Sequence, residues 1–264
     1  MATQLFKLLS DNRGKGFLRA EASGDESTIY LYDVIVSDDF WGGVSALNFA
    51  KELSAIQSPK INLRINSPGG DVFAARAMEA AIREHKSEIV AHIDGYAASA
   101  ASYVALAANK LKMSDSGFLM IHKAWSLAMG NSEDMLSMAA LLEKIDETLV
   151  DTYVNKTGAD ADQVRNWMAA ETWFTAQEAM DNGFIDEIVK PQSKTKNQWN
   201  LSAYAKPPAV DYENDASGIK ACRFDNCRIV DGANDEDCMK IQQSINYELE
   251  LAHMKRMAAL ARHL

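Results

Sequence analysis

Short runs rich in β-branched and aliphatic residues alternate with stretches of helical periodicity between residues 28 and 189. Four of these runs are predicted strands: residues 28–35, 61–66, 88–94 and 117–122. The apolar spacing over residues 71–86 predicts an amphipathic helix, whereas residues 99–109 are small and apolar on every side, which favours a buried helix. This alternation predicts an α/β domain over residues 28–189.

The last part of this predicted domain is helical in pattern, whereas the chain beyond it differs in composition. Three further helices are predicted in the domain: residues 132–156, 160–168 and 175–182. Gly158 is suited to a left-handed cap that ends the first of them. Prolines and polar residues after Val189 predict a linker over residues 190–235, and an apolar stripe predicts a C-terminal amphipathic helix over residues 236–264. Residues 1–27 are treated as an N-terminal segment.

Composition narrows the classes of protein that remain. Hydrophobic residues make up 47% and charged residues 24% of the 264 positions, which is ordinary for a globular protein with a sizeable core. A net charge of −10 disfavours binding to nucleic-acid phosphates. No run approaches the roughly 18 apolar residues of a membrane span, and charges interrupt the N-terminus, so a cytoplasmic protein without a membrane contact is expected.

The cysteines of this chain do not form a recognisable framework. Cys222, Cys227 and Cys238 are odd in number and clustered near the end, unlike the cysteines of secreted disulfide proteins. A zinc site made with His253 is an alternative, but the spacing fits no familiar zinc pattern, so plain thiols are favoured.

A first candidate for chemistry is the sequence I-N-S-P-G-G-D-V over residues 65–72, where a predicted strand turns into a helix. Gly69 and Gly70 allow positive φ and remove side chains, so backbone N–H groups there can point into a cavity beside a helix N-terminus. Such a turn can serve as half of an oxyanion hole, or simply as a tight connection.

Three side chains add candidate catalytic groups. Ser99, in G-Y-A-A-S-A-A, lies at the first turn of the buried helix, where it is either a nucleophile or an N-cap, with Ser102 as a packing residue. His122 ends a predicted strand in M-I-H and is either a base or structural, whereas His92 lies in mid-strand and is interpreted as structural. Glu171, between two predicted helices, is either an orienting carboxylate or a solvated one.

Together, these groups are what a serine hydrolase requires: a nucleophile, a base, an acid and backbone donors. The sequence has neither a Gly-Lys-Ser/Thr phosphate-binding loop nor a His-Glu-x-x-His pair, so no cofactor and no metal is expected.

The order of these motifs, continued by T-W-F-T-A-Q-E-A-M-D-N-G-F-I-D-E-I-V, resembles the proteolytic subunit of the Clp protease (ClpP). The resemblance implies a ClpP/crotonase-like ββα spiral, here followed by the linker and the C-terminal helical extension. It implies that Ser99 is the nucleophile, His122 the general base, and Gly70 and Ala100 the oxyanion-hole donors. Where the family has an aspartate, this chain has Glu171, which one extra methylene allows to serve as the third member. Asp71 is a less favoured substitute.

The same resemblance implies a serine endopeptidase that forms a homo-oligomeric ring and cleaves protein substrates without a cofactor. The Glu-Thr-Trp-Phe sequence and the extension beyond Val189 resemble the ClpP-like head maturation proteases of tailed bacteriophages more than a housekeeping Clp subunit. Those phage proteases cleave capsid or scaffold proteins in the procapsid. The location of this protein would then be the host cytoplasm or the procapsid. The alternatives are a catalytically inactive capsid assembly protein, a housekeeping Clp subunit working with an AAA+ unfoldase, and a crotonase-type acyl-CoA enzyme.

Overall fold

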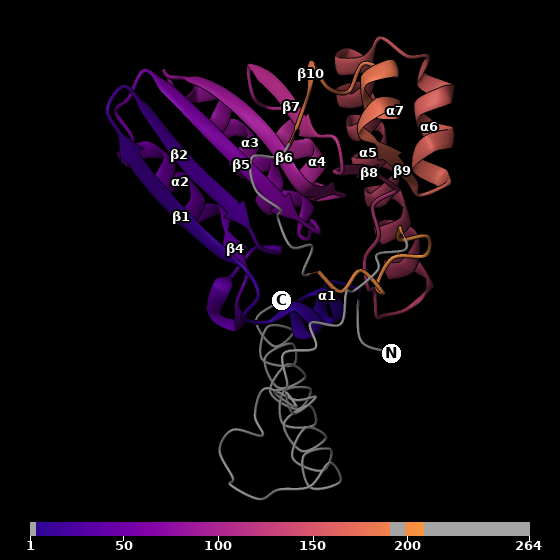
Figure 1. The fold of residues 1–264 in the computed structure, drawn as a ribbon. Coiled ribbons are helices and arrows are strands. Elements are labelled where there is room, and N and C mark those ends of the chain that lie inside the picture. The colour runs from indigo at the N-terminus through magenta and orange to yellow at the C-terminus, as the bar shows by residue number, and fades with distance from the viewer. Residues whose placement is uncertain (1–3, 191–198, 209–264) are drawn as a thin grey trace, which may run out of the picture. The chain divides into compact units, whose positions relative to one another are not determined.

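The computed structural model describes residues 4–190 and 199–208 of the chain (Figure 1). The chain divides into two compact units, residues 1–210 and 211–264, and every described residue belongs to the first. The predicted C-terminal helix, the three cysteines and His253 lie outside the described residues. No helix in the described part is long and apolar enough to cross a membrane.

One mixed sheet forms the centre of this unit, as the predicted α/β fold requires. Its main path follows the order β1 (Phe17–Ser23), β2 (Glu26–Tyr32), β5 (Lys60–Ser67), β6 (Glu88–Ala98), β7 (Lys110–Ser114) and β10 (Glu187–Val189). The β1–β2 pair is a hairpin with antiparallel register, and every later pair on this path is parallel. Two short strands, β3 (Ile35–Val36) and β4 (Val44–Ser45), form a separate parallel pair.

Strand β6 is long enough to pair with two partners in succession. Its first half, Val90 to Ile93, pairs with β7, and its second half, Tyr96 to Ala98, pairs with β8 (Phe118–Ile121). β8 in turn pairs antiparallel with β9 (Thr172–Thr175). The second half of β6 therefore brings the ends of β5 and β8 to its two sides.

Helices cover the sheet in two groups (Figure 1). The first group is α2 (Ala46–Ala55), α3 (Val72–Glu84) and α4 (Ala100–Ala105), and it buries aliphatic side chains against the strands. The second group is α5 (Ser132–Thr157), α6 (Ala161–Ala169) and α7 (Ala176–Asp181), beyond β8 and β9. The remaining elements are α1 (Gln4–Asn12) and a 3-10 turn, η1 (Asp39–Trp41).

Most predicted elements are confirmed to within a few residues, and their ends have the expected chemistry. Asn131 caps α5 in a reciprocal capping box with Asp134, and Gly158 ends that helix with φ 72°. The buried helix α4 is shorter than predicted, because it ends at Ala105 and is followed by the strand β7. The short strands β7, β9 and β10 were not predicted from the sequence, nor were α1, β1 and α2.

Two stretches differ from the organisation expected for them. The N-terminal segment 1–27 contains α1 and β1, and β1 is a full member of the sheet. Residues 199–208 fall within the expected linker, yet Trp199, Leu201 and Tyr204 are buried in a cluster with Leu8 and strand residues. Burial of the apolar surface of these three large side chains stabilises this part of the proline-rich stretch against the domain.

Candidate active site

Ser99 stands at the sharp turn between β6 and α4. Its backbone has φ 53° and ψ −124°, a conformation that side-chain-bearing residues rarely adopt. Its N–H donates to Met120 O of β8 at 2.9 Å, and its carbonyl accepts from both the N–H and the hydroxyl of Ser102. The neighbours Ala98, Ala100 and Ala101 are small and buried, so the turn fits beneath the Ser99 side chain. This geometry resembles the strained nucleophile turn of other hydrolases.

His122 follows the last residue of β8 and meets Ser99 because β8 pairs with the end of β6. The Ser99 Oγ and His122 Nε2 atoms are 2.7 Å apart. Burial lowers the pKa of His122 to about 4, and the negative charge of Glu171 opposes that decrease. The imidazole is therefore neutral at physiological pH, with a nitrogen able to accept the Ser99 proton.

Glu171 lies close to this pair but has other partners. Its carboxylate accepts hydrogen bonds from the backbone N–H groups of Ala205 (3.0 Å) and Lys206 (2.6 Å) and from Trp173 Nε1 (3.4 Å). Its own backbone has φ 50°. Between the two described side chains of Glu171 and His122 there is no hydrogen bond, so Glu171 acts on the histidine through its charge. Its place as the third catalytic residue stays a prediction.

Asp71, the less favoured candidate for the third catalytic residue, is the N-cap of α3. Its carboxylate accepts from the Ala74 N–H at 2.7 Å and caps α3. Two other polar candidates are also structural. His92 lies within β6 with Nε2 3.3 Å from Asn62 Oδ1, and the Ser102 hydroxyl lies 2.9 Å from the hydroxyl of Tyr153.

The two glycines after Pro68 are required by close contacts. A Cβ on Gly69, whose φ is 87°, would lie 2.3 Å from the carbonyl oxygen of Ala98 and 2.9 Å from Ser99 Cβ. A Cβ on Gly70, whose φ is 146°, would lie 1.9 Å from the carbonyl oxygen of Ile35. The loop therefore approaches Ser99 closely only because both positions lack side chains.

Backbone donors accompany this close approach. Ile35 pairs with the residues on either side of Gly70: its N–H donates to Gly69 O and its carbonyl accepts from Asp71 N–H. Within the described residues, the N–H groups of Gly70 and Ala100 have no protein acceptor. These are the two donors that the sequence resemblance assigns to an oxyanion hole.

Sequence reasoning missed the aromatic residues that cover the site. The ring of Tyr204 stands edge-on to the His122 ring, with centroids 5.5 Å apart, and its hydroxyl donates to the carbonyl of Pro68. The rings of Trp173 and Tyr204 also meet edge-on, with centroids 5.6 Å apart. Trp199 Nε1 donates to Asn66 O at 3.0 Å. The signal in the sequence was the presence of Trp199 and Tyr204 within the proline-rich stretch.

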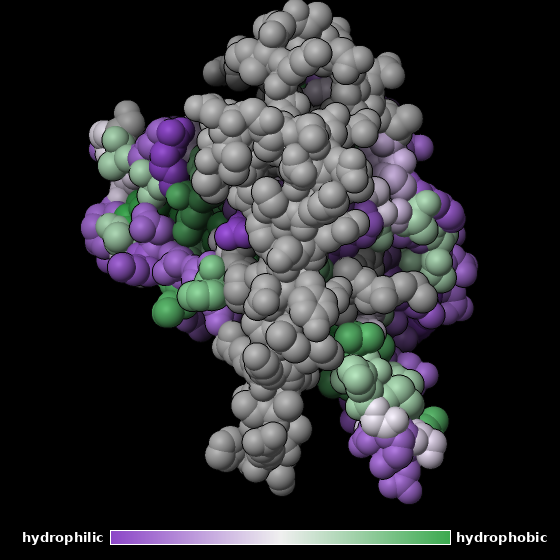
Figure 2. All heavy atoms as spheres, turned by 90° about the horizontal axis from the view of Figure 1, so that it is seen from below, coloured by the Kyte–Doolittle hydropathy of each residue, from purple (hydrophilic) through white to green (hydrophobic). Residues whose placement is uncertain are grey.

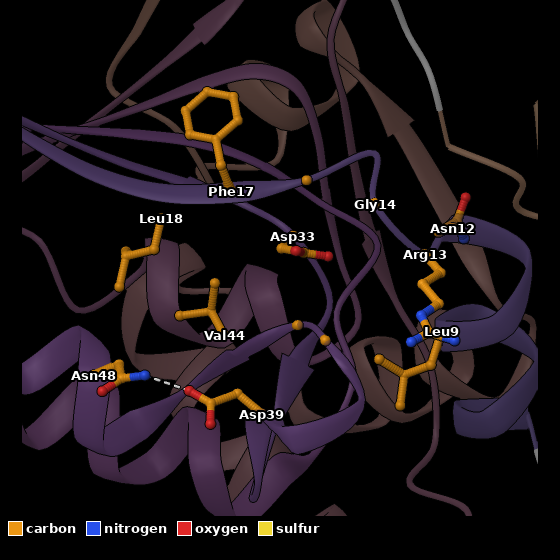
Figure 3. Close-up of a pocket in the computed structure, with 13 residues that line it drawn as sticks. Leu9, Asn12, Arg13, Gly14, Phe17, Leu18, Asp33, Asp39, Val44 and Asn48 are labelled. Carbon is orange, nitrogen blue, oxygen red and sulfur yellow. Dashed lines mark hydrogen bonds between the residues drawn. The ribbon is translucent and has the colours of Figure 1, made fainter. Parts of the chain in front are cut away.

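A pocket of about 290 Å³ lies away from these groups, between α1, β1 and the β4–α2 region (Figure 3). Asp33 projects into its middle, with Arg13 on one side and Val44 on the other. Burial raises the pKa of Asp33 to about 6. Neither Ser99, His122 nor Glu171 lines this pocket. Among the described residues, no three histidine, cysteine or acidic side chains gather as metal ligands would.

Comparison with known proteins decides the family. The family model for Clp protease matches residues 24–192, well over half of the chain. The chain belongs to the Clp protease family. In this Clp protease family member, the matched region contains Ser99, His122, Glu171 and both glycines, and it ends before the segment of residues 199–208.

Individual relatives agree with this assignment. An ATP-dependent Clp protease proteolytic subunit of Bacteroides fragilis is 32% identical over 131 residues, which cover 49% of this chain and 63% of the relative. The proteolytic subunit 1 of Leifsonia xyli subsp. xyli is 32% identical over 48% of this chain and 66% of its own length. A ClpP1 point mutant from Listeria monocytogenes has the same fold, with a TM-score of 0.55 and 24% identity over 62% of this chain and 92% of that chain. The chain thus spans a little under two thirds of the curated relatives it matches.

Proposed function

We propose that this protein is a serine peptidase that hydrolyses peptide bonds of protein substrates. The observation that carries the proposal is the 2.7 Å contact between Ser99 Oγ and His122 Nε2 at a strained strand-to-helix turn. A neutral imidazole at that distance is placed to accept the hydroxyl proton as the oxygen attacks a carbonyl carbon.

The reaction proceeds in two balanced halves. Ser99 Oγ bonds to the carbonyl carbon while its proton passes to His122 Nε2, and the tetrahedral oxyanion is received by the N–H groups of Gly70 and Ala100. His122 then returns the proton to the leaving amine as the C–N bond breaks, leaving an acyl-enzyme. A water molecule, deprotonated by His122, releases the acid and restores Ser99. One such backbone donor is worth about 3 kcal/mol in comparable sites.

A fluorophosphonate probe tests this proposal directly. The purified full-length protein should gain one adduct by intact mass, mapped by peptide mass spectrometry to Ser99, and Ser99→Ala should gain none. His122→Ala should slow the reaction at least 100-fold. Ser54→Ala serves as the serine control, because Ser54 is exposed on α2 and its hydroxyl donates to Lys51 O rather than to any residue of the site. Absence of any adduct in all forms, together with binding to capsid proteins, would instead favour the inactive assembly protein.

A finer version of the proposal concerns the biological substrate. We propose that the protein matures bacteriophage proheads by cleaving capsid or scaffold proteins, and acts as a homo-oligomer. The Glu-Thr-Trp-Phe sequence and the extension beyond Val189 support this version. Co-expression with candidate capsid and scaffold proteins should yield shortened products that disappear with Ser99→Ala. A stable, stoichiometric complex with a host AAA+ unfoldase would favour the housekeeping alternative.

A further inference from the structure

The segment of residues 199–206 lies directly over the proposed catalytic groups. Trp199, Leu201 and Tyr204 are at most 6% exposed, and they pack with Met120 and Tyr96 from the strands that carry the site. The segment follows the family-matched region, which ends at residue 192.

Tyr204 contacts both sides of the catalytic centre. Its hydroxyl donates to the carbonyl of Pro68, the residue before the two glycines, and its ring covers His122. Burial raises the pKa of the Tyr204 hydroxyl, and an interaction with the Ser99 side chain opposes that rise. The phenol therefore lies within reach of the nucleophile and of the loop that bears the Gly70 donor, where the carbonyl of a substrate would have to approach.

The segment also donates hydrogen bonds to the carboxylate of Glu171. The backbone N–H groups of Ala205 and Lys206 both donate to this carboxylate, and Lys206 Nζ donates to Ala170 O. A carboxylate that accepts two backbone N–H bonds has fewer lone pairs for the imidazole. The described site thus has Ser99 and His122 in contact while its proposed acid is engaged by the segment.

Helix α1 holds the other end of the segment. Asn12 Oδ1 accepts from the Asn200 N–H at 2.6 Å, and Asn12 Nδ2 donates to the Asn200 carbonyl at 3.0 Å. Lys7 also donates to the hydroxyl of Ser202. The backbone of the segment is therefore held at one end by the side chain of Asn12 and at the other by the carboxylate of Glu171.

We propose that residues 199–206 are an intramolecular inhibitor, which blocks Ser99 with Tyr204 and diverts Glu171 until the segment is displaced. This inference rests on the proposed peptidase function. The resting chain is then a slow enzyme, and displacement exposes Ser99, His122 and the Gly70 loop together and frees Glu171 to orient the imidazole.

The test compares the acylation rate of Ser99 by a fluorophosphonate in full-length variants. Tyr204→Ala removes the blocking ring, and Lys206→Pro removes one N–H donor to Glu171 without altering any catalytic side chain. Each should raise the second-order labelling rate at least 10-fold. Ala205→Ser is the matched control within the same segment, because Ala205 is exposed and the variant keeps the backbone N–H that donates to Glu171. Its rate should stay within twofold of the parent. Circular dichroism establishes that each variant is folded, and Lys206→Pro decides the matter if Tyr204→Ala does not fold.

A peptide added in trans gives the reciprocal experiment. The synthetic peptide of residues 199–206 should return the labelling of Tyr204→Ala towards the slow parental rate, whereas the same peptide with alanine at position 204 should not. Equal labelling rates in the parent and in both variants would overturn the inhibitor and leave the peptidase standing. If hydrogen exchange shows the segment released and Ser99 still reacts in no variant, the peptidase fails, and the inference fails with it.

Discussion

The chemistry of His122 depends on what covers it. The ring is buried and faces Tyr204, and burial rather than a charged partner dominates its lowered pKa. Glu171 opposes that decrease only through its charge, because its hydrogen bonds go to the segment and to Trp173. A base with such a low pKa is available over a wide pH range but has a weak affinity for the proton that it must take.

The acid limb of the pH–rate profile should therefore move to higher pH when the ring of Tyr204 is removed from His122. In the parent protein, labelling of Ser99 should fall only as the pH decreases through about 4, where His122 becomes protonated. In Tyr204→Ala, hydration of the imidazole should raise this pKa towards the ordinary value of about 6.5. Labelling rates measured between pH 4 and pH 8 would show this; an unchanged limb would mean that Tyr204 does not keep water from His122.

Gly69 of the loop beside Ser99 should tolerate no side chain. Gly69→Ala would force a Cβ to within 2.3 Å of a backbone oxygen at a positive φ, so we expect a loss of about 1–3 kcal/mol in unfolding free energy and at least 100-fold in Ser99 labelling. Gly158→Ala is the matched control, because that glycine also has a positive φ of 72° but faces open space. It should lose stability and retain the parental labelling rate.

Asp33 should cost stability at neutral pH. Its folded pKa of about 6 lies above the unfolded value of about 3.8, so the folded state binds the proton more tightly and the unfolding free energy falls as the pH rises from about 4 to above 6. Asp33→Asn keeps an oxygen to accept from the Val34 N–H. It should stabilise the protein by about 1–2 kcal/mol at pH 8, after allowance for partial solvent screening, and by less at pH 4.5. Urea unfolding at both pH values would measure this, and a gain independent of pH would refute the titration.

At the scale of elements, the segment of residues 199–206 is bound with little net free energy. Burial of Trp199, Leu201 and Tyr204 contributes roughly 6 kcal/mol, and the hydrogen bonds to Lys7, Asn12, Asn66, Pro68, Ala170 and Glu171 contribute roughly 8 kcal/mol more. Ordering eight residues costs about 12 kcal/mol. A segment so nearly balanced can be displaced without unfolding the sheet beneath it.

Loss of one anchor should therefore release the whole segment and little else. Trp199→Ala removes the largest buried side chain and the hydrogen bond to Asn66. Amide exchange at Ala205 and Lys206 should become at least 10-fold faster, whereas the amides of β5 and β6 should be unaffected, because the central strands open only in global unfolding. Hydrogen–deuterium exchange with mass spectrometry measures both; equal acceleration across the sheet would show that the segment is an integral part of the core.

At the scale of the whole molecule, large hydrophobic side chains reach the surface in places. Leu47 (79% exposed) and Phe73 (58%) belong to α2 and α3, and Met129 (87%) and Leu136 (71%) belong to the start of α5 and the chain before it. Figure 2 shows hydrophobic side chains gathered in patches among hydrophilic ones on one face. Apolar patches of this kind are typical of surfaces that bind other proteins, and they support the proposed homo-oligomer.

The proposed assembly should weaken when such a patch is charged. Leu136→Glu places a carboxylate in the exposed apolar surface of α5, so the molar mass measured by light scattering should decrease towards that of a smaller species. Ser137→Glu is the control, because it adds the same charge at the neighbouring exposed position, where no apolar side chain is lost. A parental mass in both variants would remove α5 from the proposed interface.

The sequence determined the α/β class, the main elements and the two side chains that meet. Strand periodicity predicts β2, β5, β6 and β8, because alternate burial leaves a direct trace in the order of residues. Ser99 and His122 stand at the ends of two such strands, and their motifs with the Gly-Gly turn were sufficient to single them out. In β7 two lysines interrupt the apolar residues, and β10 has three residues, so neither strand leaves a clear apolar run in the sequence.

Only the tertiary structure decided how these groups are connected. Ser99 and His122 are 23 positions apart in the chain and meet because β6 pairs with β8, and pairing of strands is a contact between distant parts of the chain. Residues 199–206 carry the composition of a linker, and what makes them a cover is the apolar surface that α1, β6 and β8 jointly offer to Trp199 and Tyr204. A local pattern cannot reveal that surface, because its parts come together only when the chain has folded.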